Sequence, residues 1–314
     1  MTKKRIYYLG VGILGVALIF LIQVVFSLDS PEFLEVNFLD VGQGDSILIE
    51  IPQKICWQGF ASLFNFFKNQ NKFQVLIDGG PDGKVVEKIK KEIPFFDREI
   101  EMIFLTHPDS DHINGLFEVL KTYRVKKIFL SEIKEKNELY ENFLELAKKR
   151  GAETIFVKTG HKIQLNQDAN FYILWPKENF FGDVNEKSIV SRFCFMDFCV
   201  LLTGDIPNKI EYLLLAQEAG LKNEFKGLFG LKSDVLKVAH HGSKYSTDRY
   251  FLEKVNPSVA VISVGENSFG HPTNEVLNLL SDFGIKVLRT DLNGDIKIIS
   301  DGRDFKIITK KIVK

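Results

Sequence analysis

The chain has 314 residues and three cysteines, and its 41 lysines and arginines are balanced by 41 aspartates and glutamates. This balance excludes a global basic field. A polyanion would have to bind in a local basic groove, and its binding would then depend steeply on salt. The candidate residues for such a groove are Lys232, Lys237, Lys244 and Arg289. Three cysteines form neither a disulfide scaffold nor a metal-binding motif.

The first predicted element is a membrane-spanning helix. A basic cluster at Lys3–Arg5 precedes an uncharged stretch from Ile6 to Leu28, long enough to cross about 30 Å of hydrocarbon. The cluster favours a cytoplasmic N-terminus and an extracytoplasmic body. A cleaved signal segment of a secreted protein is the alternative, although no Ala-x-Ala site precedes Asp29. We expect a single-pass anchor in the cell membrane at residues 1–30 and one domain at 31–314.

Next in the chain is an aromatic segment, residues 56–67. It separates two predicted strands, one ending near Ile51 and one at Phe73–Ile77. Three interpretations stay open: a flap over a site, a patch resting on the bilayer, or a segment packed on the domain's own surface.

The most informative motif follows the apolar strand at 102–106. Four metal-capable side chains fall within six residues, namely His107, Asp109, Asp111 and His112. Imidazoles and carboxylates together suit Zn²⁺ or Mn²⁺. The alternative is a polar loop whose aspartates cap the next helix.

Three later apolar runs also end in candidate ligands. The run 199–203 precedes Asp205, the run 235–239 precedes His240 and His241, and the run 259–263 shortly precedes His271. Open sheets place their chemistry at the carboxyl ends of strands. The repeated pattern therefore predicts that these side chains meet at one edge.

A hairpin is predicted from two apolar runs around Met196-Asp197. Its register would pair Phe195 with Phe198 and set Cys194 opposite Cys199, with Cα atoms about 4.5 Å apart, near the lower edge of disulfide geometry. An exported chain could therefore form this disulfide. The same register sets Ser188 opposite Asp205, so that Asn185 or Ser188 would shape a substrate pocket or cap a loop.

Helices alternate with these strands and no flexible linker separates them, which favours one layered domain. A second hairpin is predicted around Asn293-Gly294, joining the strands 285–289 and 295–299. The predicted helices are Val85–Glu92, Leu116–Lys121, Glu135–Arg150, Pro207–Ala219 and Asn274–Phe283.

Taken in order, these motifs resemble the metallo-β-lactamase superfamily, and within it the C-terminal hydrolase domain of ComEC/Rec2 competence proteins. The resemblance implies an α/β (α+β) fold, a four-layer αββα sandwich, here preceded by one transmembrane helix. It also implies one or two divalent metals at the rim between the sheets. The matching segments are 39–46, 76–80, 106–112, 185–188, 202–205, 240–243 and 270–272.

The resemblance also implies ligands for two ions, Zn²⁺ or Mn²⁺. His107 and Asp109 would serve one ion, Asp111 and His112 the other, and Asp205 both. Asp109 replaces the second histidine of the usual signature, which favours a harder metal such as Mn²⁺. The leading candidate for a further ligand is His240, while His241 and His271 would ligate or contact substrate. Asp78 would orient the metal-binding loop without binding metal.

Such a centre would activate a water and suit phosphodiester hydrolysis. Asp111 would handle the proton of that water, and His241 or His271 would steady developing charge. Ser243 and Lys244 would hold a phosphate, unless the lysine is only a solvated surface charge. The expected function is a nuclease acting on DNA or another phosphodiester. The alternatives are a non-catalytic DNA-uptake or envelope component and a hydrolase of lactams, lactones or thioesters.

Overall fold

The computed structural model describes residues 4, 8, 12, 14, 15, 33–53, 72–133 and 137–311. By their internal contacts, the residues divide into two compact units, Met1–Glu32 and Phe33–Lys314. Among the described residues, no helix combines the length and the apolar character needed to cross a bilayer. Most of the stretch from Ile6 to Leu28 and all of segment 56–67 lie outside the described residues. The membrane anchor and the role of that segment therefore stay predictions.

The larger unit contains two β-sheets. The first has eight strands in the order β15-β14-β1-β2-β3-β4-β5-β6. Strands β3 to β6 run parallel, so they all end at the same edge of the sheet. The bounds are β1 Leu34–Phe38, β2 Ile47–Ile51, β3 Phe73–Ile77, β4 Glu99–Leu105, β5 Arg124–Leu130, β6 Glu153–Phe156, β14 Ile296–Ser300 and β15 Phe305–Thr309.

The second sheet has seven strands in the order β13-β12-β11-β10-β9-β8-β7. Strands β10 to β13 run parallel, and β9 is antiparallel to both β8 and β10. The carboxyl ends of β8 and β10 therefore lie at the edge where β9 begins. The bounds are β7 Lys162–Gln164, β8 Ala169–Trp175, β9 Val190–Phe195, β10 Phe198–Leu202, β11 Val235–Lys237, β12 Val259–Ile262 and β13 Lys286–Arg289.

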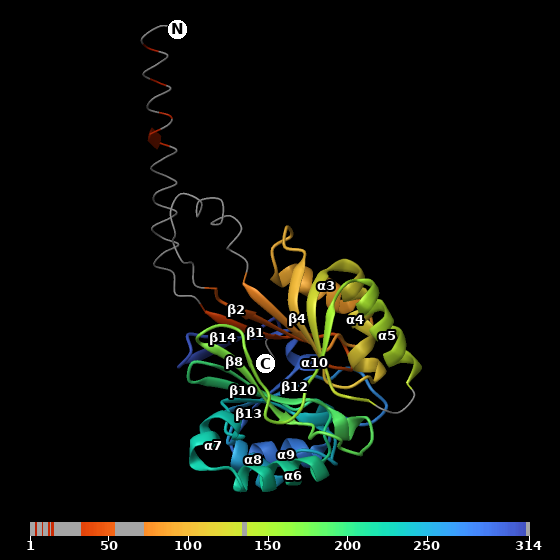
Figure 1. Cartoon of the computed structure of the whole chain (residues 1–314). Helices are drawn as coiled ribbons and strands as arrows, with labels where there is room; N and C mark the ends of the chain where they lie inside the picture. The colour runs from red at the N-terminus through yellow and green to blue at the C-terminus, as the bar shows by residue number, and fades with distance from the viewer. Residues whose placement is uncertain are drawn as a thin grey trace. The chain divides into compact units, whose positions relative to one another are not determined.

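Helices cover the outer face of each sheet, which gives the four layers of an αββα sandwich (Figure 1). The first sheet packs against α3 Lys84–Glu92, α4 Ser110–Thr122 and α5 Glu138–Lys149. The second packs against α6 Asn208–Ala219, α8 Arg249–Val255 and α9 Asn274–Asp282. Shorter elements are α7 Asn223–Phe229, α10 Thr290–Asn293 and the 3₁₀ turns η1 Asn185–Lys187 and η2 Ala239–Gly242.

An aromatic core joins the two sheets. Phe104 of the first sheet lies 4.7 Å from Phe171 of the second, measured between ring centroids, and Phe171 lies 4.8 Å from Phe193. All three rings are at most 1% exposed. Since burial of one such side chain contributes roughly 1.5–3 kcal/mol, this layer holds the two sheets in a fixed relation.

The predicted hairpin between β9 and β10 is confirmed. Phe195 pairs with Phe198 and Cys194 with Cys199, as the register required. The two cysteines form a disulfide with Cα atoms 4.2 Å apart. Met196 turns the chain with a positive φ of 52°.

The second predicted hairpin is wrong. The strand before Asn293 is β13, which pairs with β12 in the second sheet, whereas the strand after Gly294 is β14, which pairs with β1 in the first. The short helix α10 intervenes, with the Asn293 side chain accepting a hydrogen bond from the Arg289 backbone at 2.9 Å. Asn293-Gly294 therefore carries the chain from one sheet to the other.

Candidate metal centre

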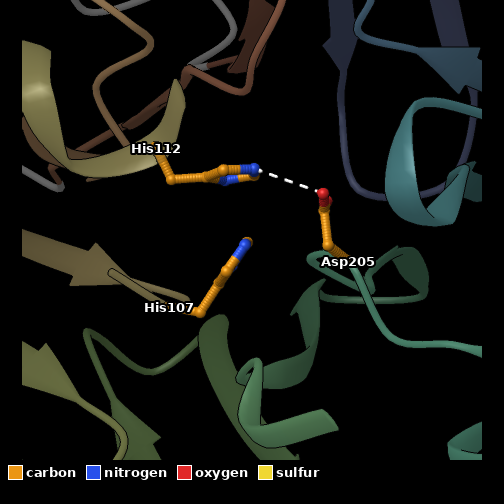
Figure 2. Close-up of side chains that lie close together, drawn as sticks. All are labelled: His107, His112 and Asp205. Atoms are coloured by element: carbon orange, nitrogen blue, oxygen red, sulfur yellow. Dashed lines mark ion pairs between the residues drawn. The ribbon is translucent and has the colours of Figure 1, made fainter. Parts of the chain in front are cut away.

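Two histidines of the first sheet meet an aspartate of the second. His107 follows β4, His112 lies in the first turn of α4, and Asp205 follows β10. Figure 2 shows the three side chains pointing toward one another. Their ligand atoms lie within 4.8 Å of one another, and His112 Nε2 is 3.4 Å from Asp205 Oδ2. The fold thus joins residues almost a hundred positions apart.

A second group shares His112. Asp111, His112 and His241 also place their ligand atoms within 4.8 Å of one another. His241 Nε2 lies 3.2 Å from Asp111 Oδ2 and 3.3 Å from Asp205 Oδ2. Because Asp205 reaches both histidines, the two groups form one continuous cluster.

Each imidazole is fixed through its other nitrogen. His112 Nδ1 lies 2.8 Å from Asp78, and His241 Nδ1 donates to the Ser263 carbonyl at 2.7 Å. The Thr106 hydroxyl donates to Asp78 at 2.6 Å, so its oxygen is left to accept from His107 Nδ1 at 3.0 Å. This arrangement directs Nε2 of all three rings into the cluster, as in histidines that ligate metals.

The three Nε2 atoms fit a metal centre by an independent criterion. Those of His107, His112 and His241 are all buried without a hydrogen-bond partner in the part of the chain that the structure describes. Buried polar atoms normally have partners, because an unmade hydrogen bond costs about 1–3 kcal/mol. A divalent cation would satisfy the three nitrogens and balance the two carboxylates beside them.

Burial and charge set the protonation of the cluster. Burial lowers the pKa of His107 well below its ordinary value, and the neighbouring His112 lowers it further, so His107 is neutral. Burial also opposes the charged form of His241, but Asp205 and Asp111 outweigh it and raise its pKa to about 10. Asp205 and Asp78 likewise raise the pKa of His112 well above its ordinary value. A metal that binds these two rings must therefore displace their protons.

A left-handed turn separates the paired histidines. His240, His241 and Gly242 have φ values of 48°, 53° and 84°, a conformation that non-glycine residues rarely adopt. The His240 N–H donates to the Gly204 carbonyl at 3.2 Å, which ties this turn to the Asp205 loop. His241 consequently lies in the cluster, whereas the ring of half-buried His240 lies 5.6 Å from that of His271.

The structure brings most of the predicted metal ligands together and leaves others outside the cluster. His107, Asp111, His112, His241 and Asp205 come together, and His240 belongs to none of the ligand groups among the described residues. Asp109 lies at the rim with its side chain 45% exposed, 3.6 Å from His107 Nε2. It occupies the N-cap position of α4 but makes no side-chain capping bond.

The residues predicted to contact substrate lie in different surroundings. Ser188 accepts a hydrogen bond from the Asp205 N–H at 3.2 Å, so it supports the loop that carries Asp205. Asn185 begins the neighbouring turn η1. Ser243 is buried and accepts from the Tyr245 N–H, while Lys244 is exposed beside the Tyr245 ring.

Sequence reasoning missed the buried pair Asp45 and Lys237. The Lys237 ammonium pairs with Asp45, lies 3.4 Å from Asp205 and donates to the Gly204 carbonyl at 2.8 Å. The prediction that Lys237 lines a basic surface groove is wrong, because Lys237 is only 1% exposed. A lysine inside the apolar run 235–239 was the available signal, since a buried ammonium requires an anionic partner.

The chain matches the model of the Metallo-beta-lactamase superfamily over residues 56–266. It is 32% identical to ComE operon protein 3 of Bacillus subtilis, over 84% of this chain and 32% of that protein. It is 29% identical to Recombination protein 2 of Haemophilus influenzae, over 95% of this chain and 33% of that protein. The chain thus spans about a third of the length of these relatives.

Among solved structures, CmlA, a diiron beta-hydroxylase from Streptomyces venezuelae, aligns with a TM-score of 0.51 and 12% identity, covering 86% of this chain and 54% of that one. At this identity the likeness shows the fold alone.

Proposed function

The chain belongs to the metallo-beta-lactamase superfamily, resembling the competence proteins within it, and we propose that it is a metal-dependent phosphodiesterase that cleaves DNA. The observation that carries the proposal is the convergence of three unpartnered Nε2 atoms on the carboxylates of Asp111 and Asp205. The relatives' names refer to recombination and competence, which favours a nucleic acid over a lactam, lactone or thioester.

The proposed ligands supply two overlapping groups. His107, His112 and Asp205 would hold one ion, with Asp109 at its open side. Asp111, Asp205 and His241, whose Nε2 lies 3.2 and 3.3 Å from the two carboxylates, would hold the other. His241 replaces His240 as the proposed further ligand, because its Nε2 faces both carboxylates. Two bound divalent ions would bring the pKa of a water toward neutrality and offset charge on a phosphodiester; Mn²⁺ and Zn²⁺ both suit imidazole and carboxylate donors.

The remaining residues would position substrate and move protons. Asp111 has its pKa lowered to about 2: burial opposes this shift, but the nearby imidazoles of His241 and His112 outweigh burial. Asp111 is therefore anionic at neutral pH and able to orient the attacking water. His240 and His271 lie together outside the ligand groups, half-buried, where they would face a phosphate oxygen or the leaving group. Ser243 and Lys244 complete this proposed substrate side.

The proposed location is the outer face of the cell membrane, with residues 1–30 as a single-pass anchor and residues 31–314 as the hydrolase domain. The disulfide between Cys194 and Cys199 supports this placement, because disulfides persist in oxidising compartments and are rare in the cytosol.

The test is hydrolysis by the purified full chain, supplied with Mn²⁺, Zn²⁺ or Mg²⁺. Substrates are single-stranded DNA, double-stranded DNA, bis(p-nitrophenyl) phosphate, a chromogenic lactam, a lactone and a thioester. Asp205→Asn is the inactive variant, and Asp301→Asn, at an exposed site on the β14–β15 turn, is the matched control. Bound metal with no hydrolysis of any phosphodiester would reject the proposal in favour of a binding component.

A further inference from the structure

A cavity of about 390 Å³ lies beside the strand ends that carry the candidate metal centre. Its walls include Glu132 after β5, Phe156 at the end of β6, and Lys177 and Phe180 after β8. The volume falls in the range of about 300–1,000 Å³ typical of small-molecule sites. None of the proposed catalytic residues lines this cavity, and of the segments that match the family only 185–188 reaches it, through Lys187.

The cavity and the metal centre share one rim. Strands β4, β5 and β6 are parallel neighbours, so the loop that carries His107 lies beside the loops that line the cavity. On the opposite sheet, Lys187 lines the cavity, and the next residue, Ser188, accepts the hydrogen bond from the Asp205 N–H. Ile189 then donates to the Thr106 carbonyl at 3.0 Å. The cavity is therefore connected to the loops of His107 and Asp205 through the consecutive residues 187–189.

The lining combines aromatic and cationic groups. Phe156 is 50% exposed, although it is a large apolar side chain at a strand end. Phe180 packs edge-on against buried Trp175, with ring centroids 4.6 Å apart, so its position is fixed. Of the three lysines that line the cavity, Lys187 is only 3% exposed, so Lys158 and Lys177 supply its accessible positive charge.

The lining lysine that could meet a phosphate is the exposed Lys177. Lys158 pairs with Glu178 at 2.8 Å, but both side chains are largely exposed, at 42% and 66%, and such surface pairs contribute little. The Lys177 ammonium lies 6.0 Å from the Trp175 ring. Aromatic walls beside ammonium groups are the pattern that single-stranded nucleic acids require, because their unstacked bases offer a face to a side chain.

We propose that this cavity binds one nucleotide of a single-stranded polynucleotide, adjacent to the phosphodiester at the metal centre. The base lies against Phe156, and Lys177 contacts the phosphate. A duplex does not fit this arrangement, since its base faces are already stacked. The inference rests on the proposed function, and it names the strand form that the site selects.

Binding of a fluorescein-labelled oligothymidylate of about 12 nucleotides tests the proposal, with a length in the range that such grooves contact. Anisotropy is measured with the full chain in EDTA, so that cleavage does not interfere. Phe156→Ala is expected to raise Kd about 5- to 150-fold, the equivalent of 1–3 kcal/mol for one lost stacking contact, and Phe156→Trp is expected to restore affinity. Lys177→Gln is expected to reduce the slope of log Kd against log salt by about 0.7.

Matched controls lie on α7, where Phe225 and Lys226 are exposed. Phe225→Ala and Lys226→Gln are expected to leave Kd unchanged. Equal effects of the α7 and cavity variants, no effect of the cavity variants, or tighter binding of the matching duplex would each overturn the proposal. Hydrolysis of bis(p-nitrophenyl) phosphate by the unaltered chain separately tests the proposed function, because this small ester does not extend into the cavity.

Discussion

The buried ammonium of Lys237 forms an ion pair with the buried carboxylate of Asp45. The same ammonium contacts Asp205 at 3.4 Å, so one cation connects the loop after β1 with the loop after β10. Burial opposes the charged form of Lys237, but Asp45 and Asp205 outweigh it and raise its pKa. Lys237 therefore carries its positive charge at neutral pH.

Lys237→Met is expected to destabilise the chain by about 3–5 kcal/mol, because it leaves a buried carboxylate without its cation. Urea unfolding measures the change. Adding Asp45→Asn should recover part of the loss, since the double variant no longer buries the unpaired Asp45 charge. The control is Lys121→Met, whose partner Glu118 is exposed and whose loss should cost less than about 1 kcal/mol. Similar losses of stability in both lysine variants would contradict a stabilising role for the buried Lys237–Asp45 ion pair.

Asp78→Asn is expected to weaken metal binding about 10- to 100-fold, because Asp78 orients His112 through Nδ1 at 2.8 Å and holds Thr106 beside His107. Competition titration with a chromogenic Zn²⁺ chelator measures the change. Asp295→Asn alters another buried aspartate, one paired with Lys88 and Lys310. It should leave metal affinity unchanged, and an equal drop there would mean that the effect is a general loss of folding.

The metal-free chain is expected to lose stability as pH rises from about 6.5 to about 10. His241 has its pKa raised from 6.5 to about 10, because Asp205 and Asp111 outweigh the opposing effect of burial. The folded chain then retains a proton that the unfolded chain releases above pH 6.5, so the stabilisation is complete below 6.5 and vanishes above 10. Urea midpoints in EDTA across this range measure it. His241→Gln should make the profile shallower but not flat, because the pKa of His112 is raised as well. An unchanged slope would refute the contribution of His241.

Gly115→Ala is expected to weaken both folding and metal binding. A methyl group at Gly115 of α4 would lie 1.8 Å from the Gly79 carbonyl oxygen, which cannot move without shifting the loop at Asp78. Overpacking of this kind costs about 1–3 kcal/mol, and the displaced helix carries His112. Thermal unfolding and Zn²⁺ titration measure the two effects.

The matched control for Gly115 is Gly227→Ala on α7, where nothing lies within 4 Å of the added methyl group. Alanine is the better helix former by about 0.8–1.0 kcal/mol, so this variant should be as stable as the parent or more stable. A Gly115→Ala protein with full metal affinity would show that α4 does not set the position of His112.

Replacing Cys194 and Cys199 together by serine is expected to lower the free energy of unfolding by about 2 kcal/mol, the loop-closure value for a short ring. The separation between the two residues is five positions. Hydrolytic activity should survive, because the pair lies between the second sheet and its helices, away from the ligand groups. Mass spectrometry of the unreduced chain tests the bond directly, and two free thiols at these positions would refute it.

The features that could be predicted from the sequence are those that depend on the spacing of apolar residues along the chain. The hairpin register, the strand before His107 and the helices α3, α5, α6 and α9 follow from apolar spacing and were confirmed within three residues at each end. Helix α4 was predicted to start at Leu116 but begins at Ser110, because the metal motif itself forms its first turn. Helices α7 and α8 were not predicted.

Features set by backbone conformation and long-range pairing were not accessible in the same way. Nothing in the pair His240-His241 shows which ring faces inward, since that depends on a left-handed turn that histidines rarely adopt. Nor does Asn293-Gly294 show that its flanking strands belong to different sheets. The partners of Lys237 lie 192 and 32 positions away, which local patterns do not reveal.

The proposed ligands come from both halves of the sandwich: His107, Asp111 and His112 from the first sheet and its helix, Asp205 and His241 from the second. A cation shared by these residues would act as a clamp across the seam, and shear between the halves would have to break coordination. Metal binding and folding would then be coupled. Each tenfold rise in free metal above its dissociation constant would add about 1.4 kcal/mol to the free energy of unfolding. A chelator that removes the ion would therefore abolish the proposed activity and lower the stability of the protein at the same time.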